Sequence, residues 1–173
     1  MSDHRTHGDT TDLESDIARI AEQERRLRFE NFNEDTAWDL GVQLRALATA
    51  RAVAVTIEVR LARETVFFCA MPGTSPANAD WARRKRNTVE MLWRSSYGVG
   101  RSLEFEGSSL EAKMGLPTRD YASHGGSMPI IATSGACIGV VTVSGLPQRD
   151  DHAMVVEALA SMCGVPLPEV AMT

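Results

Sequence analysis

The sequence predicts an α+β fold: a single domain in which an antiparallel sheet of about five strands is flanked by helices and preceded by an N-terminal helical extension. Three observations predict this fold. The chain has 173 residues, of which 43% are hydrophobic, and this suffices for one domain with a sizeable core. Segments in which apolar residues alternate come in two pairs, each joined by a short turn, as is typical of hairpins. Segments with helical spacing of apolar residues stand before, between and after these pairs.

The first two predicted helices precede the strands. Residues 13–29 repeat apolar side chains at helical spacing, opposite a charged face. The second helix begins near Asn33 and contains Gly41, although a glycine inside a helix costs about 1 kcal/mol relative to alanine. We therefore expect Gly41 to lie where this helix crosses the sheet closely.

The strands are predicted from their alternation of apolar residues. The two hairpins are expected over residues 53–59 with 65–71, and over residues 128–133 with 137–144. Ser134 and Gly135 supply a strong turn signal for the second hairpin. A short strand near Tyr121 is expected to precede it and to bring the sheet to about five strands.

A third helix is predicted over residues 75–95, because Ser75 can cap its start and a proline follows in the first turn. The helical spacing places Asn78, Trp81 and Lys85 on one face. This face is of interest because it combines an aromatic ring with a cation on an otherwise apolar surface.

Two further helices are predicted, one from a weak pattern and one from its capping residues. Residues 98–119 are weakly patterned and glycine-rich, so we expect a long excursion with a short helix over 108–114. The last helix is expected to be capped by Asp150 or Asp151 and to end at Gly164.

Composition argues against several classes of protein. The net charge of −5 argues against a general nucleic-acid surface, and no apolar run approaches the roughly 20 residues of a membrane span. Residues 1–12 are polar and lack the apolar core of a signal peptide, so we expect a disordered leader before a domain over residues 13–173. The three cysteines show no zinc-ligand spacing, so we expect reduced thiols, no metal site and a cytoplasmic location.

The strongest sign of a pocket is His124, which stands beside Gly125 and Gly126 just before a predicted strand. Glycines let a backbone approach a ligand closely. A histidine can transfer protons, ligate a metal or heme iron, or donate to an anion. The alternative is that His124 only hydrogen-bonds a loop carbonyl.

Three other places could contribute to a ligand site. Lys85, on its otherwise apolar helix face, needs either an anionic ligand or a structural salt bridge. His152 follows two aspartates at the start of the last helix, from where it either reaches the pocket or packs internally; the aspartates themselves are typical of a helix cap. Gly73 and Thr74 precede a helix N-terminus, where backbone N–H groups can meet an anion, or they form only a turn.

An ordered set of residues and motifs runs through most of the chain: Met71-Pro72-Gly73-Thr74, Asn78, Trp81, Arg84-Lys85, Ser95-Ser96, Ser123-His124-Gly125-Gly126, Pro129, Ile138-Gly139, Val143-Ser144-Gly145-Leu146-Pro147 and Asp151-His152. Over about residues 13–165 this set resembles the heme-degrading-domain (GlcG-like) family, and more narrowly its bacterial and fungal branch. The resemblance implies a profilin-like fold, dimers that assemble into larger rings or cages, and heme binding or breakdown in some relatives. It also implies a shared set of polar pocket residues: Trp81, Lys85, His124, Ser144, Asp151 and His152.

Three hypotheses of function remain open. The first is an oligomeric small-molecule-binding protein whose pocket holds an anionic group with Lys85, His124 and the backbone of Gly125 and Gly126. The second is a heme-binding or heme-degrading protein with His124 or His152 as the iron ligand, and the third is an assembly or adaptor protein without a ligand. No catalytic triad or nucleophile elbow is recognisable, which slightly favours a binding protein over an enzyme. The predicted ligand-binding residues are Gly73, Thr74, Asn78, Trp81, Lys85, His124, Gly125, Gly126, Ser144, Asp151 and His152.

Overall fold

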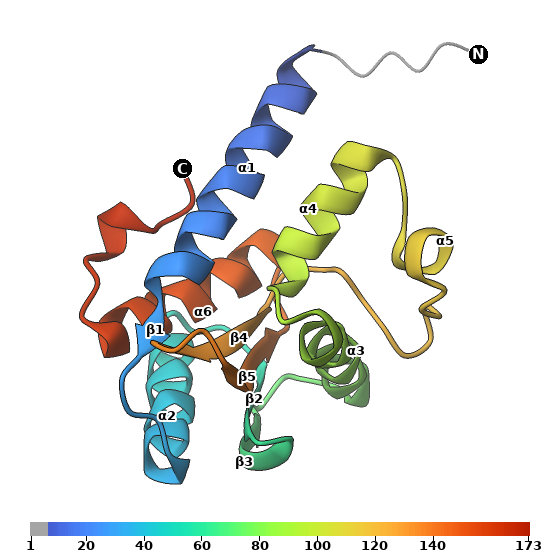
Figure 1. The fold of residues 1–173 in the computed structure, drawn as a ribbon. Helices are drawn as coiled ribbons and strands as arrows, with labels where there is room; N and C mark the ends of the chain where they lie inside the picture. Colours follow the sequence, from blue (N-terminus) through green and yellow to red (C-terminus); the bar gives the residue numbers. More distant parts are fainter. Residues whose placement is uncertain (1–6) are drawn as a thin grey trace.

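The structure, a computed structural model, describes residues 7–173. Within them the chain folds as α+β, as predicted (Figure 1). The elements are α1 (His7–Arg26), β1 (Arg28–Phe29), α2 (Glu34–Ala50), β2 (Thr56–Leu61), β3 (Glu64–Ala70), α3 (Pro76–Leu92), α4 (Ser96–Glu106), α5 (Leu110–Met114), β4 (Ser127–Ala132), β5 (Cys137–Ser144), α6 (Gln148–Cys163) and the 3₁₀ helix η1 (Leu167–Glu169).

The sheet is mixed, which corrects the prediction of a purely antiparallel one. Among residues 7–173 it has five strands in the order β1-β4-β5-β2-β3. The two predicted hairpins are present and antiparallel, but β1 pairs with β4 in parallel, with Arg28 opposite Ile131. The segment near Tyr121 forms no strand. The fifth strand is instead the two-residue β1, which is too short to show any alternation in the sequence.

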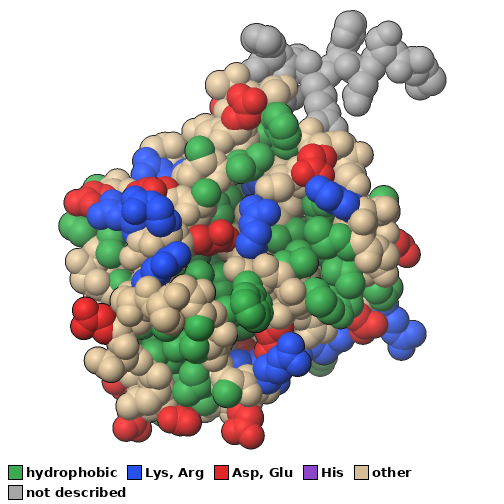
Figure 2. All heavy atoms as spheres, viewed as in Figure 1, with side chains coloured by type: hydrophobic (Ala, Val, Ile, Leu, Met, Phe, Trp, Pro, Cys, Tyr) green, Lys and Arg blue, Asp and Glu red, His purple; other side chains and the backbone are tan. Residues whose placement is uncertain are grey.

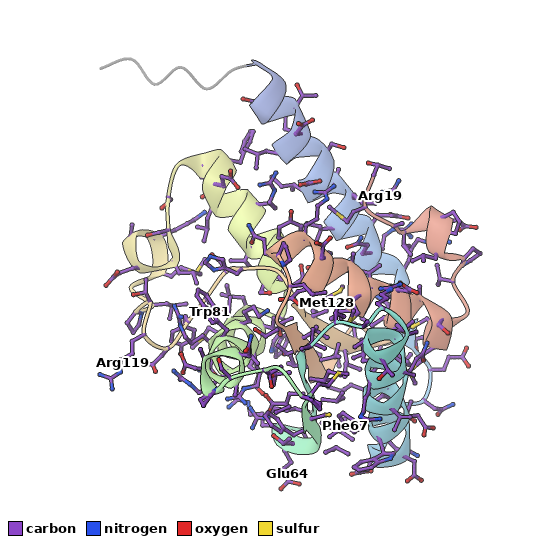
Figure 3. All side chains as sticks on the ribbon, turned by 180° about the vertical axis from the view of Figure 1, so that it is seen from behind. Arg19, Glu64, Phe67, Trp81, Arg119 and Met128 are labelled. Carbon is purple, nitrogen blue, oxygen red and sulfur yellow. The ribbon has the colours of Figure 1, made fainter. Side chains whose placement is uncertain are left out.

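The helices form a layer on each face of the sheet. α2 and α6 cover one face, α3 covers the other, and α1 packs along α4 (Figure 1). Gly41 of α2 lies where the sequence predicted a close crossing, because a Cβ atom there would come within 2.1 Å of the Phe67 ring on β3. Figure 3 shows Phe67 beside α2. Glycine therefore sets the distance between this helix and the sheet.

The two faces of the sheet differ in polarity because β2 and β5 alternate. Ile57 and Val143 pair across the strands and belong to the apolar core with α2 and α6. Thr56 pairs with Ser144 on the opposite face, where Glu58 accepts hydrogen bonds from Arg86 of α3. All of these strand side chains are buried. The α3 layer therefore packs on a polar surface, and a polar site can form between α3 and the sheet.

Several element boundaries differ from the prediction. α1 begins at His7 rather than near residue 13, so residues 7–12 of the expected leader are helical, while residues 1–6 lie outside the described part of the chain. α3 ends at Leu92 because Trp93 adopts a left-handed conformation with φ of 56°. α6 begins at Gln148 after Pro147 and ends, as predicted, at Gly164.

The helix α4 falls in the segment that appeared weakly patterned. Its glycines, unfavourable for a helix, serve packing. A Cβ at Gly98 would lie 2.9 Å from Ile20 of α1, and one at Gly100 would lie 2.0 Å from the carbonyl oxygen of Ser123. The same glycines that hide the helical pattern in the sequence thus let α4 approach α1 and the chain that leads into β4.

The surface carries both signs of charge. On the face shown in Figure 2, acidic and basic side chains are interspersed rather than separated. In the part of the chain that the structure describes, no helix combines the length and the apolar character needed to cross a membrane. Within the same residues, no three His, Cys, Asp or Glu side chains are grouped so that they could hold a metal ion.

Candidate functional site

A cavity of about 290 Å³, here called the α3 pocket, lies between the first half of α3, the segment at residues 124–125 and the loop from β5 to α6. Figure 3 shows Trp81 on α3, beside the chain that leads from α5 to β4. The pocket is lined by Asn78, Trp81, Lys85, His124, Gly125, Ser144, Gly145, Leu146, Gln148 and Asp151. Most of the predicted ligand-binding residues therefore come together here, from segments far apart in the sequence.

Four predicted site residues do not line this pocket: Gly73, Thr74, Gly126 and His152. Gly73 has a positive φ of 97° and belongs to the turn between β3 and α3. The Thr74 hydroxyl donates to the carbonyl oxygen of Met71 at 2.8 Å. These two residues therefore have the turn role that was the alternative to anion binding.

The floor of the α3 pocket contains a buried cation. Lys85 is 2% exposed, and its ammonium group donates to the carbonyl oxygens of Gly125 at 2.9 Å and Val143 at 2.6 Å. It also donates to Asp151 Oδ2 at 3.1 Å. These three bonds use all three N–H donors of the ammonium group. Lys85 therefore takes the structural salt bridge, the alternative to direct ligand contact.

Asp151 connects this cation to the loop from β5 to α6. Its carboxylate accepts from the backbone N–H groups of Leu146 at 3.0 Å and Gly145 at 3.3 Å, as well as from Lys85. Burial raises the pKa of Asp151 and lowers the pKa of Lys85, while the attraction between the two groups acts in the opposite direction on both. The pair holds the pocket floor together and leaves it without net charge.

The glycine pair beside His124 serves the chain itself. The Gly125 N–H donates to Gln148 Oε1 at 3.2 Å, and its carbonyl accepts from Lys85. Gly126 has a positive φ of 122°, and a Cβ there would lie 2.5 Å from the Lys85 ammonium nitrogen. Gly126 therefore makes room for the Val143 carbonyl oxygen and for Lys85, whereas the Gly125 amide expected to cradle an anion is bonded to Gln148.

The name rim is used here for three side chains at the pocket, Trp81, Arg84 and His124. Trp81 contacts both of the others. The Trp81 and His124 rings meet edge to face with their centroids 4.8 Å apart. The guanidinium carbon of Arg84 lies 4.3 Å from the Trp81 ring centroid. Partial burial lowers the pKa of His124, with smaller contributions from the charges of Lys85 and Arg84, so its imidazole is neutral at pH 7.

Several polar groups of the pocket have no hydrogen-bond partner within residues 7–173. They are the imidazole of His124, the indole N–H of Trp81, the amide NH₂ groups of Asn78 and Gln148, and the hydroxyl of Ser144. All five can donate a hydrogen bond while remaining uncharged. The pocket is therefore rich in neutral donors above a neutral floor.

His152 belongs to a different region. It is fully buried, its Nε2 lies 2.7 Å from Gln23 Oε1 of α1, and its Nδ1 has no partner in the described chain. Gln23 in turn donates to the carbonyl oxygen of Val170 at 2.7 Å. Burial lowers the pKa of His152 to about 3, with a further contribution from Arg149. A neutral His152 thus joins α1, α6 and the C-terminal segment.

The sequence analysis missed three lining residues, Gly145, Leu146 and Gln148. All three lie at or next to the connection from β5 to α6. The available signal was Gly145 directly after a predicted strand, since glycine there allows close backbone packing; a Cβ would lie 2.5 Å from the carbonyl oxygen of Ala54.

The fold and the pocket define a small α+β domain with a polar cavity between α3 and the sheet, and the comparisons specify its family. The chain belongs to the family described as "Haem degrading protein HbpS-like", whose model matches residues 32–160. The predicted resemblance is thereby confirmed. A UPF0303 protein of Azotobacter vinelandii is 53% identical over 160 residues, which cover 92% of this chain and 96% of that protein.

Two solved structures share the fold. The crystal structure of Ybr137w protein matches with a TM-score of 0.79 and 27% identity, over 86% of this chain and 87% of that one. The crystal structure of a PduOC:heme complex matches with a TM-score of 0.61 and 18% identity, over 70% of this chain and 88% of that one. The second likeness, at this identity, concerns the fold alone.

Proposed function

We propose that this chain is a cytoplasmic small-molecule-binding protein that acts as a homo-oligomer, holds a ligand with an anionic group in the α3 pocket, and has no robust catalysis of its own. One observation carries the proposal: five uncharged donors without internal partners surround a single cavity. A volume of about 290 Å³ is just below the roughly 300–1,000 Å³ of typical small-molecule sites, so the ligand should be small. Polar groups that converge in this way are the usual means of fixing a ligand's orientation.

The role of each residue in this proposal follows from its contacts. Trp81, which is 36% exposed, supplies an apolar wall, and His124 supplies a neutral donor or acceptor. Lys85 and Asp151 position the walls, because their charges are already paired. The ligand's charge must then be met by the hydrogen-bond donors and by a cation other than Lys85.

The test is native mass spectrometry of the protein as purified from its own cells, followed by denaturing mass analysis. We expect a small-molecule mass that is retained natively and lost on denaturation. The variant Trp81→Ala should lose this mass, whereas Met91→Ala, which removes an apolar side chain of the same helix that is 53% exposed and outside the α3 pocket, should keep it. A retained mass that is indifferent to Trp81→Ala would contradict the assignment of the pocket.

Heme binding through His124 is the second candidate, favoured by the family and by an accessible imidazole with no internal bond. The donor fits an iron ligand, and His152 does not, because its Nε2 is bonded and it is fully buried. The cavity itself, at about 290 Å³, is too small for the macrocycle. A Soret titration of wild type against His124→Ala tests this candidate, and identical spectra would remove His124 as the ligand.

Self-association belongs to the same proposal and has its own support. Trp38 and Trp93 are 54% and 61% exposed, and large aromatic side chains are enriched at protein interfaces. Size-exclusion chromatography with light scattering should show an oligomer for the wild type and a smaller species for Trp93→Ala. An unchanged mass for this variant would remove Trp93 from the interface, and a monomeric wild type would contradict the oligomer.

A further inference from the structure

Four consecutive basic residues on α3, Arg83 to Arg86, differ in how their charges are met. Arg83 donates to Asp80 and Asp120, each at 3.0 Å, and Arg86 donates to both oxygens of Glu58, at 2.9 and 3.0 Å. Lys85 is paired with Asp151. Three of the four basic side chains are therefore paired with carboxylates of the chain.

Arg84 is the fourth. Its side chain has no hydrogen bond or ion pair within residues 7–173, and its Nε is buried without a partner. The guanidinium group nevertheless has a defined position, because it stacks on the Trp81 ring at 4.3 Å. A partly buried charged donor without hydrogen bonds is unfavourable, and stacking on an aromatic face offsets only part of this cost. The packing thus keeps a cation in place with its N–H donors uncommitted.

Arg84 does not line the α3 pocket itself, but it stacks on a residue that does. Trp81, on which it stacks, lines the pocket and touches His124. The charge of Arg84 also contributes to the lowered pKa of His124, after burial and Lys85. Since Lys85 is neutralised by Asp151, Arg84 is the uncompensated positive charge among the residues of the rim and the pocket floor.

We propose that Arg84 is the charge-recognition residue of the α3 pocket and that its ligand is a small organic monocarboxylate; this inference rests on the proposed function. A carboxylate is planar and accepts two parallel N–H bonds from a guanidinium group. Its single negative charge matches the single uncompensated positive charge, whereas a phosphate dianion would carry a second negative charge that no cation of the rim or the floor is free to meet. The neutral donors of Asn78, Gln148 and Ser144 then meet oxygen atoms on the body of the ligand.

The experiment is a titration followed by the indole N–H signals of ¹⁵N-labelled full-length protein. The chain has three tryptophans, of which only Trp81 lines the α3 pocket, so Trp38 and Trp93 serve as internal controls. The probes are benzoate, its uncharged isostere benzamide, and inorganic phosphate. Binding to the variants Arg84→Gln, Arg84→Lys and Arg83→Gln is compared with the wild type.

We expect benzoate to shift the Trp81 signal and to bind the wild type at least about tenfold more tightly than benzamide or phosphate. Arg84→Gln should weaken benzoate binding about tenfold and leave benzamide binding unchanged. Arg84→Lys keeps the positive charge but loses the planar guanidinium group, so its affinity for benzoate should lie between that of the wild type and that of Arg84→Gln. Arg83→Gln, the matched control whose partners lie outside the pocket, should behave as the wild type.

The outcomes separate the inference from the proposed function. If benzoate and benzamide bind equally, if phosphate binds better than benzoate, or if Arg84→Gln binds benzoate as the wild type does, the role of Arg84 is overturned while the pocket remains a binding site. If none of the probes moves the Trp81 signal, the pocket fails as a site for such molecules and the inference fails with it.

Discussion

His124 and His152 lie in two regions that use the same side chain in opposite ways. His124 is at the rim of the α3 pocket, exposed, with both ring nitrogens free of bonds to residues 7–173 and one face against Trp81. His152 is fully buried between α1 and α6, and its Nε2 is bonded to Gln23. Both are adjacent in sequence to residues that suggest a ligand site: two glycines follow His124, and two aspartates precede His152. Depth in the fold, rather than the neighbouring residue types, separates the two roles.

The same division applies to the cations of α3. Lys85 belongs with His152 in what we call the inner network, the buried polar residues Gln23, Lys85, Asp151 and His152. Arg84 belongs with His124 at the rim. In the inner network the charged groups form hydrogen bonds and ion pairs within the chain, so substitutions there should alter the free energy of unfolding. At the rim the polar groups have no hydrogen-bond partners in the described chain, so substitutions there should alter ligand affinity. The predictions below test this division, from the largest expected effect to the smallest.

Lys85→Met is expected to have the largest effect on stability. It leaves the Asp151 carboxylate buried without its cation and removes donors from the carbonyl oxygens of Gly125 and Val143. Loss of one partner of a buried ion pair typically costs about 3–5 kcal/mol in the free energy of unfolding. Urea denaturation followed by circular dichroism measures this change.

The matched control is Arg83→Met on the same helix. Its ion pairs with Asp80 and Asp120 are partly exposed, so the free energy of unfolding should change by less than about 1 kcal/mol. A similarly small change for Lys85→Met would show that its ammonium is not committed to the inner network and would return it to the group of ligand-binding candidates.

His152 should make the protein sensitive to mild acid. Its pKa in the folded state, about 3, is below the ordinary value of 6.5, so the folded protein prefers the neutral ring. This contribution to stability is complete above about pH 6.5 and is lost progressively as the pH falls toward about 3. Between about pH 7.5 and about pH 5 the loss should be about 2 kcal/mol, measured by urea denaturation at each pH.

His152→Gln provides the comparison, because its amide can still bond Gln23 and does not titrate in this range. The difference in stability between wild type and variant should shrink as the pH is lowered over the same interval. A difference that stays constant would mean that the folded protein binds a proton at His152 as readily as the unfolded chain does.

The elements that could be predicted from the sequence are those with a local signal. Alternation indicated both hairpins, the Ser75 cap indicated the start of α3, and Gly41 indicated a close crossing. The parallel strand β1 has two residues, and the pattern of α4 is interrupted by Gly98 and Gly100. These elements depend on partners distant in the chain, on β4 for the strand and on α1 and Ser123 for the helix, which a local pattern does not reveal.

The sequence allowed most of the residues that line the candidate site to be predicted, but not the hydrogen bonds and ion pairs that these residues form. Asn78, Trp81, His124 and Ser144 were expected and do line the pocket. Which cation is satisfied internally depends on whether a carboxylate from α6 reaches it. Asp151 reaches Lys85, and no acidic group of the described chain reaches Arg84, although the two basic residues are adjacent in sequence. Helical spacing predicts which face of α3 each basic residue occupies, but it does not predict which carboxylate pairs with that residue.

His124→Ala should have the smallest effect on stability and a selective effect on binding. The residue is exposed, and its imidazole packs edge to face with Trp81 and has no hydrogen bond within residues 7–173, so the free energy of unfolding should change by less than about 1 kcal/mol. Benzoate affinity, followed by the Trp81 indole signal, should fall about threefold, less than for Arg84→Gln, because a neutral imidazole contributes a hydrogen bond rather than a charge. A loss of stability as large as that of Lys85→Met would instead place His124 with the inner network, and depth in the fold would no longer explain why the two histidines differ.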